Sequence, residues 1–149
     1  MSSPQSAATL QNSLVVSRTV QASRERVFSA WTEAAELARW FAPSADFTVV
    51  PTVDLRVGGD YRIEMQRNDG TSFTVFGTYR EIVAPEKLTY TWQWESDPTA
   101  AQTLVEIEFR SLGESTEVTL THQFLPSEIE RDKHSHGWDG CLNRLASLF

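Results

Sequence analysis

The C-terminal segment 127–149 contains the only long stretch of helical periodicity in the sequence. Ser127 followed three residues later by Glu130 is a capping box, and Pro126 precedes it where a missing N–H costs little, so we expect a helix to begin there. Apolar residues then recur at three- and four-residue spacing, at Trp138, Cys141, Leu142, Leu145 and Leu148. Because most of the preceding chain reads as strands, we expect this helix to bury its apolar face across a sheet.

Two glycines interrupt the helical pattern. Gly137 and Gly140 each cost about 1 kcal/mol relative to alanine in a helix interior. Three explanations are open: a close approach of another backbone, a bend in the helix, or space left beside Trp138. The last of these would create a cavity.

Residues 14–124 are predicted to form mainly strands, separated by turns rich in Gly, Pro, Asn and Asp. The patterns define seven strands, at about 14–20, 47–55, 61–66, 72–83, 87–95, 105–110 and 117–124. Pro51 places the second of these at a sheet edge or a bulge. In the last strand, Val118, Leu120, His122 and Phe124 are expected to share the inward face.

Two short helices are expected after the first strand. Ser23 is suited to cap one of them, and Thr32 to cap the second, which should end near Phe41. The length indicates a single domain, with residues 1–12 as a flexible tail and residues 13–149 as the domain. The fold class is therefore α+β, a curved antiparallel sheet of about seven strands wrapped around the long C-terminal helix.

Several motifs occur together and in order along the chain: WTEAAELARWF, VGGDYRIEM, NDG, GTYREIVAPEKLTYTW and GWDGCLNRL. They resemble the activator-of-heat-shock-protein-ATPase-like family. That family is part of the helix-grip superfamily (SRPBCC), together with the START lipid-transfer and birch-pollen-allergen-like proteins. The resemblance extends over residues 14–149 and implies a helix-grip fold with a cavity beneath the long helix.

The charge and composition favour some partners over others. The net charge is −7 with no basic cluster, so neither nucleic acid nor an anionic membrane surface is an expected partner. No run reaches the length of a membrane span, and the N-terminus has no signal-peptide pattern, so we expect a cytoplasmic protein. Gly58-Gly59 lacks the features of a phosphate-binding loop, and no cofactor is expected.

Aromatic residues are the main candidates for a binding site. Tyr61, Trp92, Trp94 and Trp138 are placed to line an apolar pocket, although core packing is the favoured interpretation of any one of them taken alone. With His122 and His134 they form the predicted lining for a small hydrophobic or amphipathic molecule. Binding without catalysis is the leading hypothesis.

The histidines support an alternative. His122 has inward parity and His134 lies four residues before Trp138, so the two side chains would converge. A general acid–base role would follow, as in the polyketide cyclases of the superfamily, against the simpler interpretation of hydrogen-bonded core histidines. His134 and His136 point away from each other on a helix, and no metal site is expected.

Two further partners are considered. The resemblance implies contact with a chaperone, although the related eukaryotic co-chaperones carry an additional N-terminal domain and this chain has only a short segment before Leu14. An exposed apolar patch would also allow a homodimer, which the strand pattern does not decide.

Overall fold

The computed structural model describes residues 12–149, so the predicted tail at 1–12 lies almost entirely outside the described residues. Within this part of the chain there are seven strands and three helices, as expected. In chain order they are β1 (Leu14–Val20), α2 (Arg24–Thr32), α3 (Ala34–Trp40), β2 (Phe47–Val53), β3 (Asp60–Arg67), β4 (Ser72–Val83), β5 (Lys87–Trp94), β6 (Thr103–Ser111), β7 (Thr116–Gln123) and α4 (Glu128–Ser147).

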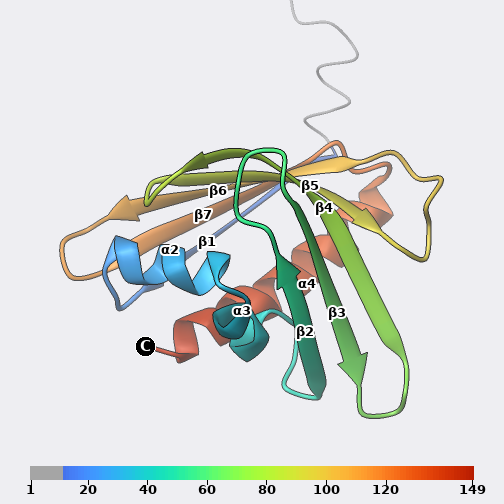
Figure 1. Ribbon diagram of the computed structural model, residues 1–149, viewed down its shortest axis with the longest axis horizontal. Coiled ribbons are helices and arrows are strands. Elements are labelled where there is room, and N and C mark those ends of the chain that lie inside the picture. Colours follow the sequence, from blue (N-terminus) through green and yellow to red (C-terminus); the bar gives the residue numbers. More distant parts are fainter. Residues whose placement is uncertain (1–11) are drawn as a thin grey trace, which may run out of the picture.

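The strands form one antiparallel sheet in the order β1-β7-β6-β5-β4-β3-β2. Consecutive strands from β2 to β7 are neighbours, and β1 pairs with β7, for example Val16 opposite Leu120. Figure 1 shows the sheet curling over α4, with α2 and α3 lying on the same side as the helix. The α+β helix-grip fold predicted from the sequence is confirmed.

Hydrogen bonds at the helix starts test the predicted caps. The Ser127 hydroxyl accepts from the Glu130 N–H at 3.1 Å, and the Ser23 hydroxyl accepts from the Arg26 N–H at 3.3 Å, so both predicted caps are confirmed. The prediction for Thr32 was wrong. Its hydroxyl instead donates to the Phe28 carbonyl at 2.9 Å inside α2, because a threonine near a helix end can bond four residues back.

The strand β7 ends one residue earlier than predicted, at Gln123 instead of Phe124. Val118, Leu120 and His122 are fully buried, but Phe124 is 51% exposed, so its inward assignment was wrong. The strand stops at Gln123, and Phe124 has φ of 68°, which breaks the alternation of a strand. Leu125, only 3% exposed, takes the inward position instead.

The apolar face of α4 packs into the core as its spacing predicted. Trp138, Cys141, Leu142 and Leu145 are all buried. Gly140 allows this packing, since a Cβ there would lie 2.4 Å from the carbonyl oxygen of Pro43. One of the two helix glycines is thus explained by close backbone approach.

Candidate functional site

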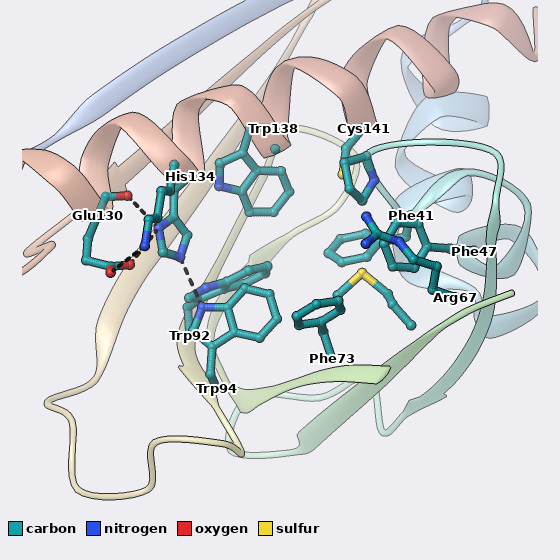
Figure 2. A pocket seen from close by; sticks show the side chains of 14 residues that line it. Phe41, Phe47, Arg67, Phe73, Trp92, Trp94, Glu130, His134, Trp138 and Cys141 are labelled. Atoms are coloured by element: carbon teal, nitrogen blue, oxygen red, sulfur yellow. Dashed lines mark hydrogen bonds and ion pairs between the residues drawn. The ribbon is translucent and has the colours of Figure 1, made fainter. Parts of the chain in front are cut away.

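A cavity of about 350 Å³ lies between α4 and the sheet. Its walls come from the loop after α3, from β2 to β5, and from the N-terminal and middle turns of α4, as Figure 2 shows. The lining side chains are largely apolar: Phe41, Pro43, Phe47, Met65, Arg67, Phe73, Trp92, Trp94, Glu130, Lys133, His134, Gly137, Trp138 and Cys141. The cavity opens to solvent near Phe73, which is 46% exposed, and near Lys133.

Gly137 accounts for part of the hollow space. Apart from its chain neighbours and the backbone of its own helix, nothing lies within 4 Å of the position that a Cβ at Gly137 would occupy, whereas Gly140 meets the Pro43 backbone. Two of the three explanations offered for the helix glycines therefore hold, each for one of the two residues. Gly140 lets a loop come close, and Gly137 leaves room beside Trp138.

The structure brings together four of the six predicted lining residues. Trp92 and Trp94 on β5 contact His134 and Trp138 on α4 on one side of the cavity. Their rings are close, with centroids 4.9 Å apart for Trp92 and Trp138 and 6.0 Å apart for Trp94 and His134. These four side chains form a continuous aromatic wall.

The other two predicted residues lie outside the cavity lining. Tyr61 belongs to a packed aromatic cluster with Tyr79 and Tyr90, and its hydroxyl donates to the Thr91 carbonyl. His122 is fully buried behind the aromatic wall, with its ring centroid 5.5 Å from that of Trp92. Both have the inward parity that the sequence indicated, but other side chains separate them from the hollow space.

His122 is held by hydrogen bonds at both ring nitrogens. Trp138 Nε1 donates to its Nδ1 at 3.1 Å, and its Nε2 lies 2.7 Å from the hydroxyl of Thr103. That hydroxyl also donates to the Trp92 carbonyl at 3.1 Å. All three contacts are satisfied together by a neutral ring protonated on Nε2. Burial, with a smaller contribution from nearby His134, lowers the pKa of His122 to about 3.

His134 is engaged in a similar way at the cavity wall. Its Nε2 accepts from Trp94 Nε1 at 3.1 Å, so the ring proton is on Nδ1. Nδ1 lies 2.7 Å from the Glu130 carbonyl and donates to it. Neither His122 nor His134 has a free nitrogen lone pair in this arrangement. The geometry suits hydrogen-bonded support of the wall better than proton abstraction.

Charged groups lie at the exposed ends of the lining and are paired. Arg67 lies 3.5 Å from Asp46 and stacks over the Phe47 ring at 5.0 Å, and Lys133 lies 3.8 Å from Glu130. Burial raises the pKa of Cys141 to about 12, which keeps its thiol protonated and a poor nucleophile. Within residues 12–149, no group of three or more His, Cys, Asp or Glu side chains is arranged to hold a metal ion.

Sequence reasoning missed most of the cavity's far wall. Phe41, Pro43, Phe47, Arg67 and Phe73 come from a loop and from strand ends. Met65 is the missed residue that the sequence could have identified, because it lies on the same inward face of the strand as Ile63. Gly137 and Cys141 were recognised in the helix pattern, but not as cavity lining.

No helix within the described residues is long and apolar enough to cross a membrane. Comparison with curated proteins returned no match. Among solved structures, a protein of Chromobacterium violaceum is 27% identical over 92% of this chain and 96% of its own length, with a TM-score of 0.84.

Two further solved structures carry the family description. An AHSA1-like protein of Aeromonas hydrophila is 26% identical over 90% of both chains, with a TM-score of 0.73. The AHSA1 protein of Silicibacter pomeroyi, at 23% identity over 91% of this chain and 95% of its own, shares the fold with a TM-score of 0.81. The family model described as "Activator of Hsp90 ATPase homolog 1-like protein" matches residues 21–149, which confirms the resemblance seen in the sequence, and the chain therefore belongs to this family.

Proposed function

We propose that this protein binds a small apolar or amphipathic molecule in the cavity between α4 and the sheet. The observation that carries the proposal is a hollow of about 350 Å³ with a largely apolar wall, beside a second aromatic region whose void is only about 10 Å³. Small-molecule sites begin at about 300 Å³, and an engineered apolar cavity of about 150 Å³ holds benzene. The cavity therefore suits a ligand of about two fused rings.

Binding without catalysis agrees best with the side chains around the cavity. Both nitrogens of His122 and of His134 already have hydrogen-bond partners. The Cys141 thiol is held in its protonated form by burial. A polyketide-cyclase-like reaction would need one of these groups to release its present partner before it reacted.

A cavity-filling variant tests the proposal. Gly137→Leu places a leucine where a Cβ meets no atom within 4 Å, and the side chain should occupy the hollow beside Trp138. Binding of the amphipathic fluorophore 8-anilinonaphthalene-1-sulfonate, followed by its emission, should weaken at least tenfold. Loss of a well-shaped apolar site of this kind removes most of the contact area of a two-ring probe.

His136→Leu is the matched control. It adds the same side chain to the same helix at an exposed residue that does not line the cavity. Circular dichroism would show that both variants keep the native fold. Equal affinity of the fluorophore for the native protein, Gly137→Leu and His136→Leu would show that it binds elsewhere and would refute the proposed site.

Native mass spectrometry of the freshly purified protein complements the titration, because it needs no assumption about the ligand. A reproducible added mass that is present in the native protein and lost in Gly137→Leu would identify the molecule. Contact with a chaperone and formation of a homodimer stay predictions from the sequence, since no contact among the described residues favours either.

A further inference from the structure

Arg67 is a charged residue on the inward face of β3. The other residues of this strand that share its parity, Tyr61, Ile63 and Met65, are all buried, and Met65 lines the cavity as Arg67 does. The alternation of the strand therefore calls for an apolar side chain at this position. The Arg67 side chain instead brings a charge to the cavity lining and is 43% exposed. A charge that breaks the pattern of an inward face is expected at a functional site.

The guanidinium of Arg67 has hydrogen-bond donors that the protein does not use. It lies over the Phe47 ring, 5.0 Å from the ring centroid, and this contact engages its charge but none of its N–H groups. Oδ2 of Asp46 lies 3.5 Å from Nε, and within residues 12–149 no N–H of the guanidinium makes a hydrogen bond. Because a guanidinium carries five N–H donors, a ligand in the cavity competes only with water for them.

Arg62, on the same strand, shows a guanidinium whose donors are used. Its Nε and Nη2 donate to the two carboxylate oxygens of Glu95 at 2.7 and 3.0 Å, and it does not line the cavity. The two arginine side chains are similarly exposed, at 50% for Arg62 and 43% for Arg67. Arg67 therefore differs from Arg62 in lacking the planar acceptor with two oxygens that fits a guanidinium fork.

The acids near the cavity do not fill this role. Glu130, which belongs to the lining, lies 3.8 Å from Lys133, and Figure 2 shows it on the opposite side of the cavity from Arg67. The carboxylate of Asp46 accepts a hydrogen bond from the Ser44 hydroxyl and is not part of the lining. An anionic group in the cavity can therefore bind Arg67 without displacing a hydrogen bond of that side chain.

We propose that the ligand is an apolar carboxylate whose body of about two rings lies in the cavity and whose carboxylate accepts two hydrogen bonds from the Arg67 guanidinium. This inference rests on the proposed binding function and narrows its ligand class. Because the Arg67 side chain is partly exposed, the carboxylate keeps part of its hydration while the apolar body is buried. A neutral ligand of the same shape would lack the charged acceptor that fits the guanidinium.

Two probes of the same shape test the inference: 2-naphthylacetate, an anion at neutral pH, and the neutral 2-naphthylacetamide. Their dissociation constants are measured for the native protein, for Arg67→Gln and for Arg62→Gln. The different hydration of the two probes cancels when the ratios of their dissociation constants are compared between proteins. Loss of a bidentate, partly exposed contact in Arg67→Gln should change the ratio by about five- to tenfold in favour of the amide.

Arg62→Gln is the matched control. It makes the same substitution on the same strand, changes the net charge by the same amount and leaves one carboxylate without its arginine, Glu95 instead of Asp46. Its probe ratio should equal that of the native protein, because Arg62 does not line the cavity. A direct readout comes from the Arg67 Nε–H resonance of the native protein, which should move with naphthylacetate and not with naphthylacetamide.

The outcomes separate the two levels of the proposal. Gly137→Leu should weaken the binding of both probes, which would show that they occupy the cavity. If they do, but Arg67→Gln leaves their ratio unchanged or Arg62→Gln changes it equally, the role of Arg67 is refuted and the binding function stands. The same conclusion follows if only the amide binds. If neither probe binds the native protein, or Gly137→Leu binds both as tightly, the proposed binding site fails and this inference fails with it.

Discussion

The space beneath the sheet has two aromatic regions that differ sharply in packing. One lies among α2, α3 and the middle strands, and its residues, Trp31, Leu37, Phe41, Tyr61, Ile63, Tyr79 and Tyr90, leave a void of only about 10 Å³. The other lies between α4 and β2 to β5 and encloses about 350 Å³. Phe41 belongs to both and forms the wall between them.

The two regions also differ in whether their buried polar atoms have hydrogen-bond partners. In the packed region, Trp31 donates to the Tyr90 hydroxyl and Tyr61 donates to the Thr91 carbonyl. Burial raises the pKa of both Tyr61 and Tyr90, so both hydroxyls remain protonated. In the hollow region the Trp92 N–H is unpaired. Aromatic content alone therefore does not distinguish a filled region from a hollow one.

The largest effect is expected from truncating a tryptophan that packs against two residues of the filled region, Trp31 and Phe41. Trp40→Ala removes a fully buried ring that lies 4.7 Å from Trp31 and donates to the Ala30 carbonyl. It should lower the free energy of unfolding by about 3–5 kcal/mol, measured by urea denaturation. Trp94→Ala, at the partly buried wall of the hollow region, should cost less than half as much. Equal losses would contradict the distinction between the regions.

The next largest effect on stability distinguishes the two helix glycines. Gly140→Ala would bring a methyl group to 2.4 Å from the Pro43 oxygen and force the loop away, at a cost of about 1–3 kcal/mol. Gly137→Ala meets open space and should stabilise the protein by up to about 1 kcal/mol through helix propensity. Thermal unfolding of both variants measures the contrast. A stabilising Gly140→Ala would mean that α4 does not approach the loop so closely.

The effect that is smallest near neutral pH concerns the buried histidine behind the cavity wall. The pKa of His122 in the native protein is about 3, below the ordinary 6.5, so between these values the unfolded chain takes up a proton that the native protein does not. Stability should therefore fall as the pH falls through this window, by about 1 kcal/mol per pH unit. Above pH 7 both states are neutral at this residue, and the contribution vanishes.

His122→Gln isolates this contribution. The amide can accept from Trp138 and donate to Thr103, but it does not titrate. Urea unfolding at pH values from 7.5 to 4.5 should show a shallower loss of stability in the variant, while the carboxylates contribute equally to both proteins. Parallel pH profiles would show that His122 is protonated in the native state, and that the wall of the hollow region is wetter than the structure indicates.

Most of the fold was predictable from the sequence, because its signals are local. The alternation in β5 and the spacing in α4 placed Trp92, Trp94 and Trp138 on inward faces, and the capping pattern at Ser127 located the helix start. The errors arose where local rules compete. Thr32 bonds back into its own helix, and Phe124 turns outward because its positive φ ends the strand.

The site was less predictable, because a cavity is the sum of contacts between distant parts of the chain. Parity showed that Tyr61 and His122 face inward, but not that other side chains cover them. Arg67 at the end of β3 and Phe73 near the start of β4 line the same cavity as residues of α4. No pattern within either strand encodes this meeting of distant segments.

By itself the sequence determined the elements, their buried faces and the family, since these depend on residue spacing along short segments and on motifs in a fixed order. Only the tertiary structure decided which aromatic residues enclose open space and which fill the core. Gly137 and Gly140 illustrate the reason. They are identical in the sequence and share one helix, but one faces a cavity and the other faces the Pro43 backbone, because the fold brings a loop against one turn of α4 and leaves the preceding turn uncovered.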